Sequence, residues 1–450
     1  MSGGRPLPQP AARRWFALLG LLMAITGLIG VGLLPWRYPS SSLLYKFGPD
    51  RSLLLVGKTI GLVAGALLLV QLVLVARLPA LERMVSQNRL IAAHRVVGIT
   101  LVGMAVVHPL LIFSSDDLRT IPVSWEYWPE IVGAFVLMAF LAMAMTAVGR
   151  AFFRLPHHLW KIGHRLVVLP LMAVLVVHVF FVNDGYASGV PLVFLIALVV
   201  CFALGWIWVA VRPLRRFHLH RVVSSAPAGD SAITVTLQPL NGRGLSHAPG
   251  QFVYLRFRSR ALSFEEHPFT IASAPEAQAQ LRVTIRCCGD WTQRVGNVSS
   301  GDLAAVQGPF GLFSPEAIKG WRRLILIAGG VGITPMLSIL AHLAAVGDQR
   351  PLTLIWSNRT RSGRVHAEQI DDLGRRLNHC RIYHLFSREP EAGQQYGRID
   401  RQRLSQYLGV HQPGTYVFIC GPAGFMPTVQ HALGRLGYPS TAIMTERFHM

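Results

Sequence analysis

Four histidines form two pairs with the same spacing in apolar sequence, His94 with His108 and His164 with His178, fourteen residues apart in each case. At about 100° per residue, fourteen residues fall roughly 40° short of four whole helical turns, so both members of a pair face one stripe of a helix. They lie about 21 Å apart along the axis. A lone histidine on an apolar face is more often a core residue. The duplicated spacing favours two b-type haems, one above the other, with these histidines as the iron ligands.

The elements that carry these histidines are apolar enough to cross a membrane. The chain has 450 residues, of which 52% are hydrophobic and only 14% are charged. A span of about 30 Å of hydrocarbon needs about 20 apolar residues. Six runs before residue 212 meet this requirement, at about 15–34, 53–76, 90–112, 131–149, 164–182 and 191–211. We therefore predict a six-helix transmembrane haem domain over residues 15–212, after a disordered tail over residues 1–14.

The first apolar run has two interpretations. Arg13 and Arg14 precede it, as basic residues precede a signal peptide. The run is longer than a usual signal sequence, and no convincing small-residue cleavage site follows it. We expect a retained helix.

Basic residues in the connecting loops predict the orientation of the helices. They gather on one side of the predicted membrane domain, at Arg77, Arg83, Arg89, Arg150, Arg154, Lys161, Arg212, Arg215, Arg216 and Arg221. The positive-inside rule then places both termini in the cytoplasm of a multi-pass protein of the plasma or inner membrane. His94 and His164 would meet at the inner leaflet, and His108 and His178 at the outer leaflet.

The net charge of +21 reflects this loop bias in large part, and part of it is expected to face anionic lipid. No basic run is interleaved with aromatic residues, so we expect no nucleic-acid partner. The five cysteines show no C-x-x-C spacing, which argues against an iron–sulfur cluster. We expect no disulfides, because four of the five would face the reducing cytosol.

After residue 213 the sequence pattern is that of soluble domains. Short alternating segments at 232–237, 251–257 and 281–286, separated by turn residues, predict an antiparallel β-barrel over residues 213–316. From residue 317 to 450, buried strands at 324–328, 352–356 and 416–420 alternate with helical sequence, including 336–345. This alternation predicts an α/β nucleotide-binding domain.

Several motifs in this half have spacings that suit flavin and nucleotide binding. The segment 267–270 reads His-Pro-Phe-Thr, and a strand that presents a ring and then a hydroxyl can stack on a flavin and bond its N5 edge. The glycine-rich segment 329–335 lies between a strand and a helix, where free backbone N–H groups favour phosphate. Further motifs lie at 285–292, 308–311, 420–422 and 446–448.

In this combination and order, the motifs resemble those of the NADPH oxidase and ferric reductase family of transmembrane flavocytochromes b. The resemblance covers about residue 53 to the end. It implies a ferredoxin-NADP-reductase-like module with FAD on the barrel and NADPH on the α/β domain. The implied FAD residues are His267, Pro268, Phe269, Thr270, Arg286, Gly289, Trp291 and Thr292. Of these, Arg286 and Thr292 would hold the pyrophosphate of FAD. The implied nucleotide residues are Gly329, Gly330, Gly332, Thr334, Pro335, Cys420, Gly421 and Pro422.

The resemblance also implies residues at the point of hydride transfer. These are Thr270 beside the flavin, Cys420 beside the nicotinamide, and Phe448 as an aromatic lid on the flavin. The family chain ends with this aromatic residue, whereas here His449 and Met450 follow it. This departure weakens the lid assignment for Phe448.

Three arginines follow the strand that ends at Trp356: Arg359, Arg361 and Arg364. They can bind the 2′-phosphate of adenosine, which would select NADPH over NADH, or they can be a solvated basic loop. We favour the phosphate and expect Arg359 and Arg361 to contact it. Arg95 and Arg165 each follow an inner histidine; haem propionates and simple positive-inside bias explain them equally well.

These expectations combine into an electron path from cytosolic NADPH through FAD and two haems to an acceptor across the membrane. Oxygen, giving superoxide, is the first choice of acceptor, and a ferric or cupric chelate is a close second. An alternative interpretation is a cytochrome subunit that passes electrons to an extracytoplasmic redox partner. A flavin reductase merely tethered by helices is a further alternative, against which the histidine pairs argue.

Overall fold

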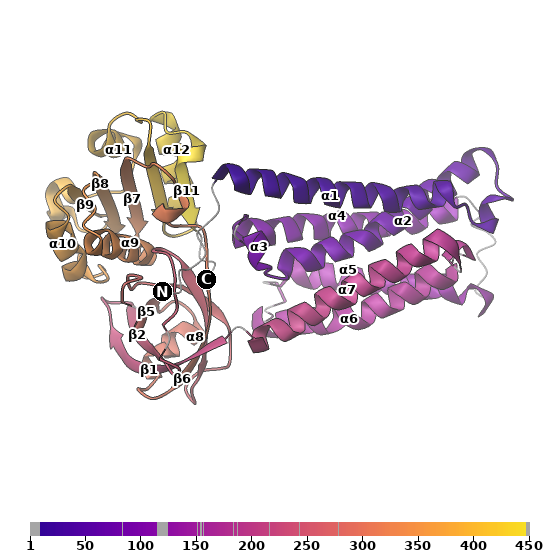
Figure 1. The fold of residues 1–450 in the computed structure, drawn as a ribbon, viewed down its shortest axis with the longest axis horizontal. Helices are drawn as coiled ribbons and strands as arrows, with labels where there is room; N and C mark the ends of the chain where they lie inside the picture. Colours follow the sequence, from indigo (N-terminus) through magenta and orange to yellow (C-terminus); the bar gives the residue numbers. More distant parts are fainter. Residues whose placement is uncertain are drawn as a thin grey trace. The chain divides into compact units, whose positions relative to one another are not determined.

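A computed structural model describes residues 10–82, 84–114, 125–150, 152–153, 155, 157–182, 184–186, 188–215, 217–242, 244–277 and 279–446. The chain divides into a helical unit, Arg14–Pro213, and a second unit built on Leu214–Met450 (Figure 1).

The helical unit contains the six membrane-capable helices that the apolar runs predict. They are α1 (Pro10–Arg37), α2 (Gly48–Val75), α4 (Gln87–Ser114), α5 (Trp128–Val148), α6 (His157–Val182) and α7 (Gly189–Arg215). Two short connecting elements lie between these helices, η1 (Ser41–Leu43) before α2 and η4 (Asp184–Tyr186) before α7. In hydrocarbon a helix satisfies its own backbone hydrogen bonds, which is why long apolar runs adopt this form.

One boundary of the helical unit differs from the sequence prediction. Residues 10–14 were expected in a disordered tail, but α1 already begins at Pro10. Proline is favoured at the first position of a helix, and alanine and arginine, which follow here, are strong helix formers. The rest of the predicted tail, residues 1–9, lies outside the described residues.

The two histidine pairs are separated by an apolar layer. Helix α2 packs along α4, and α5 packs along α6. Leu101 on α4 and Leu171 on α6 are buried in one cluster with Val136 and Phe140 of α5. Leu101 lies seven residues from both His94 and His108, and Leu171 lies seven residues from both His164 and His178. The cluster therefore lies between the two histidine levels.

The first domain of the second unit is the predicted antiparallel barrel. Its strands are β1 (Phe217–Pro227), β2 (Ala232–Pro239), β3 (Phe252–Arg258), β4 (His267–Thr270), β5 (Leu281–Arg286) and β6 (Leu303–Phe310). They pair in the order β4-β3-β6-β1-β2-β5. A bridge between Ile271 and Val283 joins the two edge strands and closes the barrel. Alternate residues of these strands fill the interior, as the period of two predicts.

The second domain is a parallel sheet covered on both faces. Its strands are β7 (Arg323–Gly329), β8 (Leu352–Asn358), β9 (Cys380–Phe386), β10 (Thr415–Cys420) and β11 (Ile443–Glu446), in the order β11-β10-β7-β8-β9. Helices α9 (Ile333–Ala345) and α10 (Ala367–Arg376) cover one face. Helices α11 (Arg401–Leu408) and α12 (Phe425–Arg435) cover the other. Both faces are buried, which explains the continuous apolar runs in the sequence.

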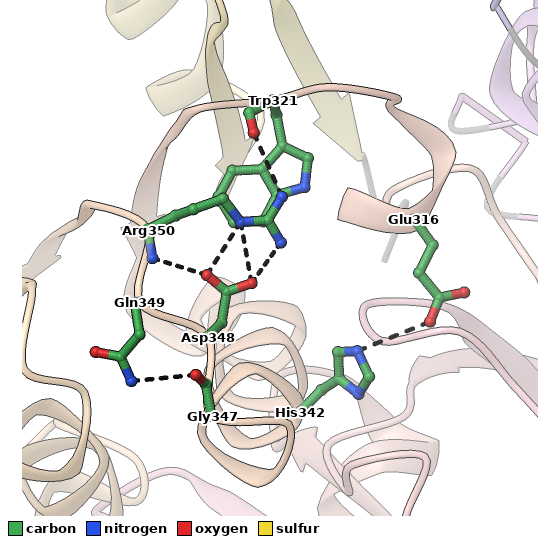
Figure 2. Close-up of polar contacts among 7 residues, drawn as sticks. All are labelled: Glu316, Trp321, His342, Gly347, Asp348, Gln349 and Arg350. Atoms are coloured by element: carbon green, nitrogen blue, oxygen red, sulfur yellow. Dashed lines mark hydrogen bonds and ion pairs between the residues drawn. The ribbon is translucent and has the colours of Figure 1, made fainter.

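The turn between α9 and β8 is fixed by a cation–π and ion-pair cluster (Figure 2). The Arg350 guanidinium lies 3.3 Å from the centre of the Trp321 ring, and its Nε donates to Asp348 Oδ1 at 3.0 Å. Arg350 Nη1 also donates to the Trp321 carbonyl at 3.3 Å. The segment that precedes β7 is thereby tied to the start of β8.

Polar contacts also join the barrel to the α/β domain. Ser338 on α9 donates from Oγ to the Ser273 carbonyl at 2.8 Å. His366, just before α10, lies with its Nε2 2.9 Å from Thr284 Oγ1 and 3.1 Å from Thr234 Oγ1. These contacts set the relative position of the two domains on which the flavin and nucleotide motifs lie.

Candidate redox sites

The structure places the four histidines in two facing pairs, one pair above the other. The ring centres of His94 and His164 lie 6.5 Å apart, and those of His108 and His178 lie 6.4 Å apart. A metal–imidazole bond is about 2.0–2.1 Å, so two imidazoles on opposite sides of one metal ion have ring centres about 6.3 Å apart. Both distances therefore fit two imidazoles on opposite sides of one iron.

Backbone carbonyls orient three of the four rings. His178 Nδ1 lies 2.7 Å from the Pro129 carbonyl, His108 Nδ1 lies 2.8 Å from the Gly57 carbonyl, and His94 Nδ1 lies 3.4 Å from the Gln71 carbonyl. A carbonyl accepts from an imidazole N–H, which leaves Nε2 with its lone pair for a metal. His164 Nδ1 is buried and has no hydrogen-bond partner within the described part of the chain.

Two glycines allow the rings of His108 and His178 to lie against neighbouring helices. A Cβ on Gly61 of α2 would lie 2.7 Å from His108 Nδ1, and one on Gly133 of α5 would lie 2.5 Å from His178 Cε1. Either distance is well inside van der Waals contact. The rings of the His108–His178 pair are thus positioned by close packing as well as by hydrogen bonds.

A cavity adjoins the His108–His178 pair, and both histidines line it. Cofactor pockets are mostly apolar, and apart from Lys58, Tyr186 and the two histidines the residues that line this cavity are apolar. The donor set, the ring spacing and the cavity therefore fit a haem between His108 and His178, and the His94–His164 pair repeats the ring spacing.

The flavin motif lies on β4 at one end of the barrel sheet. His267 and Phe269 lie on one face of this strand against Trp291, with ring centres 4.2 and 6.0 Å from that of the indole. Thr270, on the opposite face, is buried. Trp291 itself is a core residue whose Nε1 donates to the Ser263 carbonyl at 3.0 Å. Trp291 thus supports the half-buried rings of His267 and Phe269.

The predicted pyrophosphate loop is ordered by its own threonine. Thr292 Oγ1 accepts from the backbone N–H groups of Gly289 at 2.9 Å and Cys288 at 3.0 Å. Thr292 belongs to the short helix α8 (Asp290–Gln293), and Gly289 is the residue before it. Arg286, the last residue of β5, is half-buried beside this loop. The threonine hydroxyl therefore shapes the loop, and its contact with phosphate remains a prediction.

The nucleotide motifs meet where the strand order reverses. Strand β7 has β8 on one side and β10 on the other, and ligands of such sheets bind in the crevice beyond the carboxyl ends of these strands. The loop after β7 contains Gly330, whose φ of +55° favours glycine, and Gly332. A Cβ on Gly332 would collide with the Cys420 carbonyl at the end of β10. Both predicted nucleotide loops are thus in backbone contact.

The neighbours of these loops explain part of the motif sequence. Thr334 Oγ1 donates to the Val331 carbonyl at 3.1 Å and closes the turn into α9. Trp356 Nε1 donates to the Gly330 carbonyl at 3.1 Å. The predicted nucleotide residues Gly329 and Pro422 face each other, since a Cβ on Gly329 would lie 3.0 Å from Pro422 Cδ.

A buried acid accompanies Cys420. Glu446, the last residue of β11, pairs with Cys420 in the parallel sheet, and both side chains are buried. Burial raises the pKa of the Glu446 carboxyl to about 8. Burial and then the neighbouring Glu446 raise the pKa of the Cys420 thiol. The sequence offered Glu446 only as part of a terminal motif, without a signal for its burial. Phe448 lies outside the described residues.

The three arginines after β8 have different surroundings. Arg361 Nε lies 3.7 Å from Glu389, and Arg364 Nη1 lies 3.8 Å from Asp371. Arg359 is exposed at the carboxyl end of β8, and its carbonyl accepts from the Arg388 N–H at 2.9 Å. The contact of Arg359 with a nucleotide phosphate stays a prediction.

Comparisons with known protein families match three consecutive parts of the chain. Residues 60–177 match the ferric reductase like transmembrane component, residues 218–314 match an FAD-binding domain, and residues 326–431 match an oxidoreductase NAD-binding domain. These matches define a membrane oxidoreductase with a flavin- and nucleotide-binding reductase module. The chain has the domain architecture of the NADPH oxidase and ferric reductase family of flavocytochromes b.

Individual relatives share part of this architecture. A flavohemoprotein of Bordetella pertussis is 28% identical over 242 residues, which cover 51% of this chain and 60% of the relative. A flavohemoprotein of Deinococcus radiodurans is 30% identical over 256 residues, which cover 54% of this chain and 60% of the relative. The chain thus spans about 60% of the length of these two relatives.

One solved structure resembles the chain over most of its length. A flavohemoglobin from Malassezia yamatoensis, with bound FAD and haem, has a TM-score of 0.51 and 18% identity. The similarity covers 90% of this chain and 99% of that chain. At this identity it shows a likeness of fold.

Proposed function

We propose that this protein moves electrons from cytosolic NADPH, through FAD and two b-type haems, to an acceptor on the opposite side of the membrane. The observation that carries the proposal is the pair of facing imidazoles at each of two levels, with ring centres 6.5 and 6.4 Å apart. When bound, the flavin supplies the conversion of a two-electron hydride donor into the single electrons that haem iron accepts.

The chain's own residues have separate tasks in this scheme. The Gly329–Gly332 turn and the Cys420 turn bring backbone N–H groups to one crevice, where a helix N-terminus favours phosphate. The predicted catalytic residue Thr270 would present its hydroxyl to the flavin, and Cys420 would lie beside the nicotinamide. Glu446, with its raised pKa, holds a proton next to Cys420 at neutral pH.

Nucleotide choice rests on Arg359. A guanidinium can bind a phosphate through two parallel hydrogen bonds. Arg361 and Arg364 already lie near carboxylates, which leaves them as secondary contributors. We therefore propose NADPH as the physiological donor.

The four histidines would hold the two haem irons, and an acceptor would then be reduced without binding to iron. We propose oxygen, giving superoxide, as the acceptor. A ferric or cupric chelate, or an extracytoplasmic redox protein, is the alternative. Both termini would lie in the cytoplasm, on the basis of the arginine-rich loops.

The test uses the purified full chain with FAD and NADPH, and measures superoxide and ferrous iron in parallel. Superoxide that forms at the same rate with and without a ferric chelate supports the oxidase. Ferrous iron formed at the expense of superoxide supports the chelate reductase. His164→Ala should remove mainly the inner haem and block electron delivery to the outer one. Haem-free protein, or spectra unchanged by replacement of all four histidines, would refute the proposal.

A further inference from the structure

A loop of the α/β domain is fastened to the FAD-binding barrel. The segment 359–366, which we call the arginine loop, begins with Arg359 and ends with His366, just before α10. His366 contacts Thr234 on β2 and Thr284 on β5 of the barrel. We propose that His366 is a positioning residue that holds the arginine loop, and with it Arg359, against the barrel, so that the preference for NADPH depends on these two threonines. The inference rests on the proposed phosphate contact of Arg359.

The contact is a closed triangle of three polar groups. His366 Nε2 lies 2.9 Å from Thr284 Oγ1 and 3.1 Å from Thr234 Oγ1, and the two hydroxyls lie 3.0 Å apart. Thr234 and Thr284 are directly opposite each other in the antiparallel pairing of β2 and β5. Thr284 is only 5% exposed, so the His366 ring satisfies a hydroxyl that water hardly reaches. The two barrel strands therefore present a fixed polar pair to the end of the arginine loop.

The backbone of His366 has a conformation that needs such support. Its φ of 57° and ψ of 36° lie in the left-handed region, where a side chain crowds the backbone. Among the described non-glycine residues, only Arg77 also has a positive φ. A residue stays in such a conformation where its surroundings hold it there, and such residues gather at segments that bind ligands. The two threonines supply this hold for His366.

A second contact with the barrel lies nearer to Arg359. Ser362 Oγ donates to Asp230 Oδ2, in the turn between β1 and β2, at 2.5 Å. The same hydroxyl lies 3.3 Å from Thr360 Oγ1, on the residue that follows Arg359. The barrel thus holds the arginine loop at two points, one of them only three residues from Arg359.

His366 acts through position and not through charge. Burial, and then the nearby Arg282, lower the pKa of the His366 ring, so the ring is neutral at neutral pH. A neutral ring adds no charge to attract a phosphate. Arg359, in contrast, carries its charge at every physiological pH. Loss of the His366 contact should therefore change NADPH binding through the placement of Arg359.

The test uses the full chain with FAD and compares the double variant Thr234→Val, Thr284→Val with Thr236→Val as a matched control. Valine keeps the branched shape that suits a strand and removes only the hydroxyl. Thr236 lies two residues further along β2 and makes no hydrogen bond to His366. The KM and kcat are measured with NADPH and with NADH. The Kd of adenosine 2′,5′-bisphosphate, which carries the 2′-phosphate alone, is measured by calorimetry.

The double valine variant should raise the KM for NADPH about fivefold and weaken bisphosphate binding to a similar extent, with kcat and the KM for NADH unchanged. The double serine variant keeps both hydroxyls and should behave like wild type. His366→Asn should give the same rise as the two valines, because asparagine tolerates the left-handed conformation but is too short to reach the threonines. This variant decides the question if the double valine variant does not fold.

A combination with Arg359→Ala tests whether His366 acts through Arg359. In that background the two valines should raise the KM for NADPH no further, because the placement of a guanidinium cannot matter once the guanidinium is gone. Valines that raise the KM as much in this background as in wild type would refute the positioning role. The same rise in Thr236→Val would also refute it, since Thr236 does not bond His366.

Failure of the phosphate contact can be told apart from failure of this inference. A wild-type chain that uses NADPH no better than NADH, or an equal rise in both KM values in Arg359→Ala, refutes the proposed phosphate contact and this inference together. A rise for NADPH alone in Arg359→Ala, with the double valine variant and His366→Asn both like wild type, refutes the role of His366 and leaves the phosphate contact standing.

Discussion

Replacement of Gly133 by alanine tests whether the position of His178, a proposed iron ligand, is set by close packing. The new Cβ would lie 2.5 Å from His178 Cε1. Carbon atoms pack at about 3.5 Å or more, so the ring would have to move by roughly 1 Å. Metal–ligand distances hold to about 0.2 Å, so a shift of this size breaks the bond to iron. Alanine is also the better helix former by about 0.5–1 kcal/mol, so the helix itself should not suffer.

The assay is the haem content per chain of purified protein, with the reduced-minus-oxidised spectrum. Gly133→Ala should fall from two haems to about one and keep the spectrum of the His94–His164 site. Gly103→Ala is the matched control, because its Cβ would meet nothing within 4 Å and it lies on the helix of His108. If Gly133→Ala keeps two haems with an unchanged spectrum, His178 does not ligate iron in the position described.

Three further predictions concern the reductase unit. Arg359→Ala should raise the KM for NADPH about tenfold and leave the KM for NADH nearly unchanged, because a charged phosphate contact contributes roughly 1.5–3 kcal/mol. In steady-state kinetics with both nucleotides, an equal rise in both KM values would mean that Arg359 has only a structural role. In the wild type, the raised pKa of Glu446 keeps the folded carboxyl protonated while the unfolded one ionises, so the free energy of unfolding should fall as the pH rises from 4.5 to about 8, by at most about 1.4 kcal/mol per pH unit. Glu446→Gln should remove this fall, and melting temperatures that change with pH in parallel in both proteins would contradict the prediction. Phe448→Ala should retain FAD but change the rate of flavin reduction and the NADPH preference in stopped-flow measurements; identical kinetics for wild type and a chain ending at Glu446 would exclude a lid.

Elements that depend on local sequence could be predicted well. The six spans follow from runs of apolar residues, and the strands at 324–328, 352–356 and 416–420 from buried β-branched sequence. Element ends were less accurate, as the start of α1 at Pro10 shows. Strands β1, β6, β9 and β11 were not predicted, because their polar, short or mixed sequences have no clear periodicity and are held in place by pairing with neighbouring strands.

Features of the sites that depend on distant pairs could not be predicted. The contact of Gly61 with His108 joins residues 47 positions apart, and nothing near Gly61 in the sequence marks it. Glu446 is buried only because β11 pairs with β10. The motif marks Trp291 as a cofactor residue, and only the packing of the barrel shows that it supports His267 and Phe269. The histidine spacing, in contrast, depends on helix geometry alone.

The central claim is that electrons cross the membrane through the two histidine levels. The most direct measurement uses the full chain in sealed vesicles that contain ferric citrate, with NADPH and FAD added only outside and the ferrous product detected inside. The account predicts internal ferrous iron that depends on NADPH and disappears in both His164→Ala and His178→Ala. Internal iron that stays oxidised while external acceptor is reduced, or reduction that persists in both variants, would contradict it.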